Sequence, residues 1–190
     1  MVQKVLVFLY PGCAEFEITV ACWQIAESSK YEIETIAYDH VPISTNSGFS
    51  MVPDELVSDI QSTDEIAGVI IPGGSLLDLR IELQALLHKL EKQKKLLAAI
   101  CAGPQYLAAS GVLGSRLFTT SRTPEKYLES NEPDPFDWKN FRDVRVNVDE
   151  NFITAKGFAF SDFAITIWEY LGLISSDKER EEWIIKFFRK

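Results

Sequence analysis

Apolar residues in this chain gather in short, nearly continuous runs that alternate with longer segments of helical periodicity. Three runs lack the polar–apolar alternation of a half-exposed strand, which predicts strands buried on both faces. They are Val5–Leu9, Ile66–Ile71 and Leu96–Ile100. Two further segments, Tyr31–Tyr38 and Thr45–Val52, predict a fourth strand and a weaker strand or hairpin.

Helical periodicity fills most of the intervals between these runs. Leu77–Lys94 carries its leucines on one stripe, as expected of an amphipathic helix. The other predicted helices are Glu15–Ser28, Gln105–Ser110, Ser161–Leu173 and Asp177–Phe188. Val144–Val148 and Phe152–Ala155 predict two short strands joined as a hairpin.

Buried strands that alternate with helices predict βαβ units, and hence a mostly parallel sheet with helices on both faces. We therefore expect an α/β fold, a three-layer α/β/α sandwich, in a single domain over residues 1–190. Ligands bind such sheets beyond the carboxyl ends of the strands. Glu17, Gly73 and Cys101 each follow a predicted strand, so we expect them to meet at one edge.

Cys101 stands at the bend between a predicted strand and a predicted helix. Ala102 and Gly103 follow it, and Pro104 opens the helix. Small residues let the backbone turn sharply and hold the cysteine in a strained, exposed position. The amino end of the helix would also favour the thiolate. A cysteine in an apolar segment is otherwise usually inert packing, but this frame favours a nucleophile.

Carboxyl groups and glycine amides are candidates to act with Cys101. Glu15 and Glu17 both open the first predicted helix, and spacing alone does not separate them. An ionised carboxylate would raise the pKa of the thiol, whereas a protonated one would donate a hydrogen bond to the thiolate. Gly73 and Gly74 form a turn whose amides, with the amide that follows the cysteine, could stabilise an oxyanion.

Composition and charge narrow the classes of function. A net charge of −9 without a basic patch argues against a nucleic-acid partner. The three cysteines are irregularly spaced, which predicts neither a disulfide framework nor a zinc site and suits a reducing compartment. We find no signal peptide and no membrane-spanning apolar stretch, so we expect a cytoplasmic protein without a membrane partner. No metal or other cofactor is predicted.

Two features leave alternatives open. His40 falls in a predicted loop and His88 on a predicted helix face, so no Cys–His dyad is evident. The segment Asn131–Phe141 is rich in proline and aromatic residues. It is either a lid that brings Trp138 to a pocket or a surface excursion pinned by its rings.

Four segments, in this order, resemble motifs of the DJ-1/PfpI (ThiJ) superfamily, which has the class I glutamine amidotransferase-like fold. They are Tyr10–Glu17, Val69–Gly74, Ala99–Pro104 and Lys156–Phe163. The resemblance implies a flavodoxin-like sandwich, a homodimer, and a nucleophile elbow with Cys101 as its nucleophile. It also implies that Glu17, rather than Glu15, pairs with the cysteine, and that the amides of Gly74 and Ala102 form the oxyanion hole.

Ser121 stands where many members of this superfamily have a histidine. Serine is a poor general base, which counts against one possible function, that of an amidase or peptidase. We expect Cys101 to attack a small electrophile such as a 2-oxoaldehyde, in glyoxalase-, deglycase- or hydratase-like chemistry linked to stress protection. The second alternative is a non-enzymatic redox sensor or chaperone-like stress protein. Gly73, Ser121 and Trp138 are expected to line the pocket.

Overall fold

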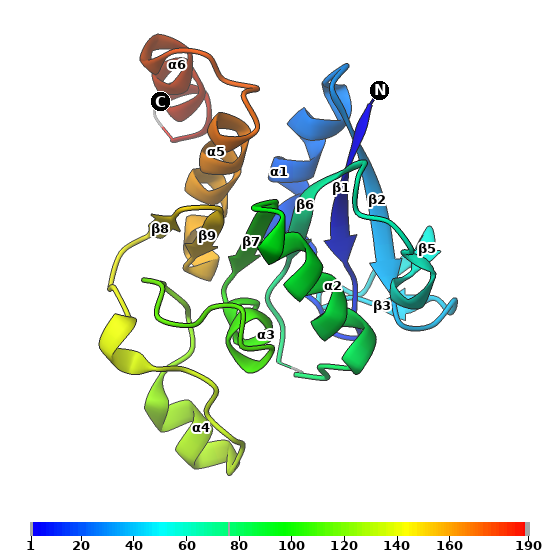
Figure 1. Ribbon diagram of the computed structural model, residues 1–190. Helices are drawn as coiled ribbons and strands as arrows, with labels where there is room; N and C mark the ends of the chain where they lie inside the picture. Colours follow the sequence, from blue (N-terminus) through cyan, green and yellow to red (C-terminus); the bar gives the residue numbers. More distant parts are fainter. Residues whose placement is uncertain (1, 76, 189–190) are drawn as a thin grey trace.

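The continuous apolar runs become the central strands of a seven-stranded sheet in the computed structural model, which describes residues 2–75 and 77–188 (Figure 1). The strand order is β5–β2–β1–β6–β7–β9–β8. The bounds are β1 Gln3–Phe8, β2 Tyr31–Ala37, β5 Glu55–Leu56, β6 Ile66–Ile71, β7 Leu96–Ile100, β8 Val146–Asp149 and β9 Phe152–Ala155. All neighbours pair in parallel except β8 and β9. The predicted mostly parallel sheet is confirmed.

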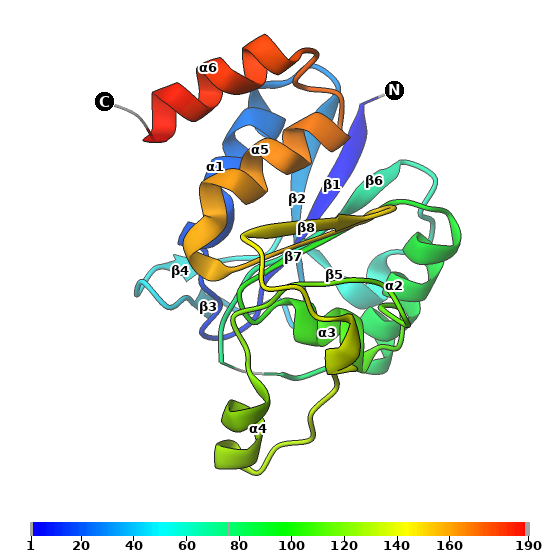
Figure 2. The ribbon, with the colours of Figure 1, turned by 90° about the vertical axis from the view of Figure 1, so that its left-hand side faces the viewer.

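Helices cover both faces of this sheet (Figure 2). Helices α1 (Phe16–Glu27) and α5 (Phe160–Tyr170) lie together on one face, and α2 (Ile81–Lys92) lies on the other. The short α3 (Pro104–Ala109) follows β7, and α6 (Asp177–Phe188) packs on α5. The predicted three-layer, flavodoxin-like α/β/α sandwich is confirmed.

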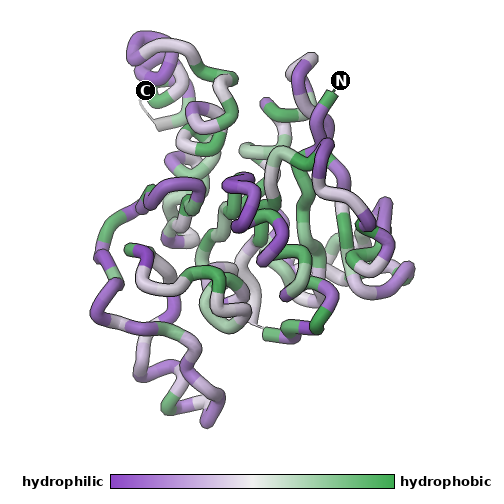
Figure 3. Tube along the Cα trace, in the orientation of Figure 1, coloured by the Kyte–Doolittle hydropathy of each residue, from purple (hydrophilic) through white to green (hydrophobic). Residues whose placement is uncertain are grey.

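The core lies between the sheet and these helices. Val5 and Leu6 of β1, and Val69 and Ile70 of β6, are fully buried. Burial of one such aliphatic side chain contributes about 1.5–3 kcal/mol, so the buried residues of the central strands contribute strongly to the stability of the fold. Figure 3 shows hydrophobic residues concentrated in the strands, whereas α4 (Pro124–Ser130) and α6 are mostly hydrophilic.

Helix α2 is shorter than the segment Leu77–Lys94 that its periodicity predicts. Two tyrosine hydroxyls hold the chain before it. The Tyr38 hydroxyl donates to Asp78 O at 2.8 Å and accepts from the amide of Arg80 at 3.0 Å, while the Tyr106 hydroxyl accepts from the amide of Asp78 at 3.4 Å. These bonds replace the first turn of the predicted helix. At the other end, Lys94 adopts a left-handed φ of 55° that stops the helix.

Three small elements complete the chain. β3 (Ile43–Ser44) and β4 (Ser50–Met51) form an antiparallel hairpin near the predicted Thr45–Val52 segment. The two-residue strand β5 and the helix α4 were not predicted. α4 has seven residues and buries only Tyr127, too little for a periodic apolar signal. None of the helices in the described ranges has the length and hydrophobicity needed to cross a bilayer.

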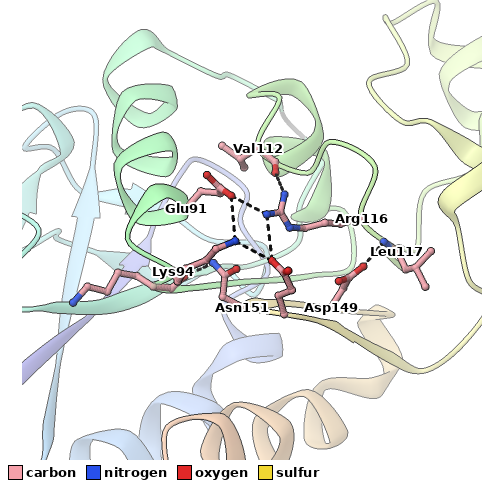
Figure 4. A network of polar contacts seen from close by, with 9 residues as sticks. Glu91, Lys94, Val112, Arg116, Leu117, Asp149 and Asn151 are labelled. Atoms are coloured by element: carbon pink, nitrogen blue, oxygen red, sulfur yellow. Dashed lines mark hydrogen bonds and ion pairs between the residues drawn. The ribbon is translucent and has the colours of Figure 1, made fainter.

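A charged network ties the elements together at the amino ends of β7 and β9, away from Cys101 (Figure 4). The Arg116 guanidinium contacts Glu91 of α2 at 2.7 Å and Glu150 of the β8–β9 turn at 3.5 Å. The next residue, Leu117, donates its amide to the Asp149 carboxylate at 2.7 Å. The network thereby anchors the start of the segment that leads to Ser121.

Candidate active site

Three strand ends meet at the carboxyl edge of the sheet, where β1 lies between β2 and β6. The chain continues from β1 to β2 on one side and later returns to β6 on the other side of β1. Such a switch in strand order is where α/β sheets bind ligands. Glu17 follows β1, Gly73 follows β6 and Cys101 follows β7. The Gly73 amide donates to Glu17 Oε2 at 2.9 Å, and the Glu17 carboxyl shares a hydrogen bond with the Cys101 thiol. The structure thus brings the three predicted residues together.

Cys101 occupies a strained turn. Its φ is +62°, in the left-handed region that non-glycine residues rarely adopt. Its amide donates to Ala155 O at 2.8 Å, and its carbonyl accepts from the Thr120 hydroxyl at 2.6 Å and the Ser121 amide at 2.8 Å. A Cβ on Gly103 would lie 2.5 Å from the carbonyl oxygen of Ile71, so only glycine fits there. Three hydrogen bonds to the Cys101 backbone therefore hold the elbow against its strain.

Two glycines make room for the Glu17–Cys101 pair. A Cβ on Gly73 would overlap the Glu17 carboxyl and lie 2.6 Å from the Cβ of Cys101. A Cβ on Gly157, in the short 3₁₀ turn before α5, would lie 2.7 Å from Glu17 Oε1 and 2.9 Å from the sulfur. Sequence reasoning did not assign Gly157 to the site, although it lies within the Lys156–Phe163 motif. The sequence signal that could have identified it is a single glycine two residues after the end of a buried strand.

The Glu17 carboxyl and the Cys101 thiol control each other's ionisation. Glu17 is 4% exposed, and this burial raises the pKa of its carboxyl. Burial and the nearby Glu17 carboxylate raise the pKa of Cys101 to about 11. Because the charge of each group opposes ionisation of the other, the pair resists carrying two negative charges at once. The turn alone therefore does not favour a free thiolate, and α3, with six residues, is too short to offset these effects.

Ser121 donates a hydrogen bond to the sulfur. Its hydroxyl lowers the pKa of Cys101, and its Oγ accepts from the Gly157 amide at 2.9 Å, which fixes the hydroxyl in place. Ser121 therefore acts as a hydrogen-bond donor, and not as a general base, at the position where a histidine was expected. Neither histidine lines the cavity above Cys101 in the described part of the chain. The ring of His88 lies 2.9 Å from Ser110 O on the surface of α2.

The two residues expected to supply the oxyanion hole, Gly74 and Ala102, line the same cavity. The Ala102 amide makes a hydrogen bond to the Cys101 sulfur. Gly74 has a φ of +152°, and a Cβ there would lie 2.8 Å from the Tyr10 hydroxyl oxygen, so the turn requires glycine. Both residues line an open cavity of about 290 Å³ above Cys101.

Two basic residues that sequence reasoning missed also line this cavity. Arg122 follows Ser121, and Lys126 lies on α4. Asn46, from the turn between β3 and β4, is on the lining as well. No local pattern predicts these positions, because they reach the site through the fold of the 110–130 segment.

Gly73 does not line this cavity, contrary to the sequence-based prediction, and neither does Trp138. Its indole packs on Phe118 and Phe136, with ring centroids 6.0 and 5.2 Å apart, and donates to the Asp134 carboxylate. Phe136 in turn stacks on the buried Phe118 at 4.9 Å. The segment 131–141 is therefore pinned by its aromatic rings, as in the second of the two predicted alternatives.

Comparison with known proteins decides the family. The model of the DJ-1/PfpI family matches residues 3–170. The chain belongs to the DJ-1/PfpI family. It is 28% identical over 175 residues to the Parkinson disease protein 7 homolog of Danio rerio, covering 89% of each chain. It is 32% identical over 175 residues to the glutathione-independent glyoxalase DJR-1.2 of Caenorhabditis elegans, again covering 89% of each.

The solved structures support the same DJ-1/PfpI fold. A DJ-1 superfamily protein from Agrobacterium tumefaciens superposes with a TM-score of 0.79 at 24% identity, covering 97% of both chains. The resemblance seen in four sequence motifs is thus confirmed. Within the described residues, no group of three or more histidines, cysteines or carboxylates is placed to bind a metal ion.

Proposed function

We propose that this DJ-1/PfpI protein converts small 2-oxoaldehydes into 2-hydroxy acids, with Cys101 as the nucleophile. The observation that carries the proposal is the Glu17–Cys101 pair, held at a left-handed elbow beneath an open cavity. A thiol and a carboxyl that share one proton supply a nucleophile and an acid–base group at the same point. The naming of the Caenorhabditis elegans relative as a glutathione-independent glyoxalase supports this chemistry.

The first step forms a hemithioacetal. The Cys101 sulfur bonds to the aldehyde carbon, the carbonyl double bond opens, and the proton of the pair ends on the new hydroxyl group. The amides of Gly74 and Ala102 would stabilise the oxygen while it carries negative charge. Glu17 is left ionised and next to the substrate.

The later steps need no external oxidant. Glu17 removes the hydrogen from C1 as a proton and returns it to C2, while the hydroxyl proton moves from the C1 oxygen to the C2 oxygen. C1 is thereby oxidised to a thioester and C2 is reduced to an alcohol. Water then cleaves the thioester, which releases the 2-hydroxy acid and restores the thiol of Cys101. Deglycase-like release of aldehyde adducts, which we also predicted, would begin with the same attack.

Turnover of methylglyoxal by purified variants tests this proposal. We expect lactate from the unchanged protein and a loss of at least about 100-fold in Cys101→Ser, since the hydroxyl is a far weaker nucleophile. Cys22→Ser is the matched control, because Cys22 is a half-buried cysteine of α1 that does not line the cavity. Equal rates for the unchanged protein and Cys101→Ser would refute the catalytic role.

We also propose that the protein is a homodimer formed around this edge of the sheet. Three large side chains there are solvent-exposed: Phe16 of α1 by 49%, Phe49 of the β3–β4 turn by 65%, and Phe158 before α5 by 67%. Exposed aromatic clusters are typical of protein–protein interfaces. Sedimentation should give a dimer mass for the unchanged protein and a monomer for Phe49→Asp. A monomeric unchanged protein would contradict the proposal.

One observation favours redox sensing as a second function. Glu17, Ser121 and the Ala102 amide all make hydrogen bonds to the sulfur, and the same groups could hold a sulfinate. Oxidation of the thiol by two molecules of hydrogen peroxide would yield the sulfinic acid and two molecules of water. Intact-mass analysis after mild peroxide should then show two added oxygens, confined to Cys101. Preferential oxidation elsewhere would argue against this function.

A further inference from the structure

The cavity above Cys101 is more basic than the protein around it. The chain carries a net charge of −9, yet Arg122 and Lys126 line the cavity. Among the described residues that line it, Glu17 is the only acidic one, and its carboxyl is engaged with Cys101 and Gly73. No ion pair joins Arg122 or Lys126 to a carboxylate within residues 2–75 and 77–188. Both cations are therefore available to a ligand.

Arg122 is fixed in position without being neutralised. Its Nη2 donates to Ser75 O at 2.8 Å, directly beyond Gly74, and its guanidinium lies 5.5 Å from the ring centre of Tyr127. Its Nε is buried and has no hydrogen-bond partner among the described residues. A buried donor without an acceptor is costly, so this guanidinium keeps hydrogen-bonding capacity that no group of the described residues satisfies. The guanidinium fork is well suited to a carboxylate.

Lys126 adds a second positive charge on the same side. Its ammonium group donates to Ser121 O at 3.3 Å, from the residue whose hydroxyl contacts the sulfur. Through Ser75 and Ser121, both cations are tied to the backbone segments that surround Cys101. An anion held by them would lie a short distance from the sulfur, within the 290 Å³ cavity.

We propose that Arg122 and Lys126 form an anion subsite, so that the preferred electrophile is a 2-oxoaldehyde carrying a carboxylate. This inference rests on the proposed function and specifies its substrate class. The aldehyde carbon faces Cys101 while the carboxylate binds Arg122 and Lys126. A chain of a few carbons between the two groups spans the cavity. A substrate of this kind is 4,5-dioxopentanoate, which would yield 2-hydroxyglutarate.

The test compares 4,5-dioxopentanoate with its methyl ester, which has the same reacting groups and no charge. We expect the unchanged protein to favour the acid by about 10–100-fold in kcat/KM, mainly through KM, because a charge-assisted contact is lost in the ester. Arg122→Gln and Lys126→Gln should each reduce this preference, measured as the ratio of kcat/KM for acid and ester within the same variant. Arg142→Gln is the matched control, since Arg142 also donates only to backbone carbonyls but lies outside the cavity. Equal rates for acid and ester in the unchanged protein would overturn the proposal.

A second measurement does not depend on turnover. Levulinate (4-oxopentanoate) carries the carboxylate but no aldehyde, so it should bind the subsite and slow alkylation of Cys101 by iodoacetamide. Methyl levulinate should not protect, and Arg122→Gln should abolish protection by the acid. If no 2-oxoaldehyde is consumed but levulinate protects, the proposed function fails and the anion subsite stands. Absence of protection in the unchanged protein would refute the subsite itself.

Discussion

The carboxyl group of Glu17 and the thiol of Cys101 share a hydrogen bond at the carboxyl edge of the sheet. Each group is buried enough that the charge of one opposes ionisation of the other. In the mechanism we propose, Cys101 is the nucleophile and Glu17 is its acid–base partner. This relationship would allow the site to operate without a histidine.

Glu17→Gln should lower turnover of a 2-oxoaldehyde by about 10²–10⁴-fold, the range expected for loss of a general acid–base group. The amide of glutamine can still accept the hydrogen bond from Gly73, so the fold should persist. Glu15→Gln is the matched control: Glu15 is equally buried but does not line the cavity. Comparable losses in the two variants, measured at equal folded fraction, would contradict the role of Glu17.

Glu17→Gln should also change how stability depends on pH. The pKa of Glu17 in the folded protein is raised above its ordinary 4.5. Its protonated form therefore stabilises the fold below pH 4.5, and this contribution is lost as the pH rises through the raised value. Glu17→Gln should gain stability over the unchanged protein between pH 4 and pH 8, by about 1.4 kcal/mol per unit of pKa difference. Urea denaturation of both proteins at pH 4 and pH 8 measures their free energies of unfolding. A difference between the two proteins that does not change with pH would contradict the raised pKa of Glu17.

Gly157→Ala should disrupt the catalytic pair. The added methyl would lie 2.7 Å from Glu17 Oε1 and 2.9 Å from the sulfur, so at least one of these groups must move. We expect turnover to fall by at least about tenfold, because small displacements of reacting groups have large effects on rate. Gly111→Ala is the control: it has a φ of +85° and open space around it, so it should lose stability without losing activity. Full activity of Gly157→Ala would show that the site tolerates the methyl.

Ser121→Ala should make Cys101 less reactive. The Ser121 hydroxyl lowers the pKa of the thiol, so its removal raises that pKa further and reduces the thiolate fraction at pH 8. The rate of alkylation by iodoacetamide should fall by a few-fold, and Ser130→Ala, on the exposed end of α4, should leave it unchanged. A faster rate in Ser121→Ala would mean that the hydroxyl does not donate to the sulfur.

The sequence is enough to place Glu17, Gly73 and Cys101 together, because each follows a buried strand and parallel strands end at one edge. It does not separate Glu15 from Glu17 by spacing. That distinction depends on which carboxyl meets the Gly73 amide across 56 positions of sequence. The resemblance to the DJ-1/PfpI motifs implies that Glu17 is the partner of Cys101, and the contact with Gly73 agrees with this.

The remaining features depend on tertiary contacts that no local pattern reports. Lys126 reaches the cavity from the short helix α4, which buries one residue and leaves no periodic signal, and Arg122 reaches it from the segment just before that helix. Trp138 sits in an aromatic cluster away from the cavity, since its neighbours Phe118 and Phe136 offer it a better apolar contact. Helix α2 begins later than its periodicity predicts, because the hydroxyl of Tyr38 binds the backbone of Asp78 and Arg80 where the first helical turn was expected.

The central claim is that the sulfur of Cys101 bonds covalently to the aldehyde carbon during turnover. Rapid acid quenching of the protein with methylglyoxal, followed by peptide mass analysis, tests it most directly. The account predicts one added methylglyoxal on the Cys101 peptide, accumulating in Glu17→Gln because the next step needs the carboxylate. Lactate formation by Cys101→Ser at the rate of the unchanged protein, with no adduct on the Cys101 peptide at any time, would contradict it.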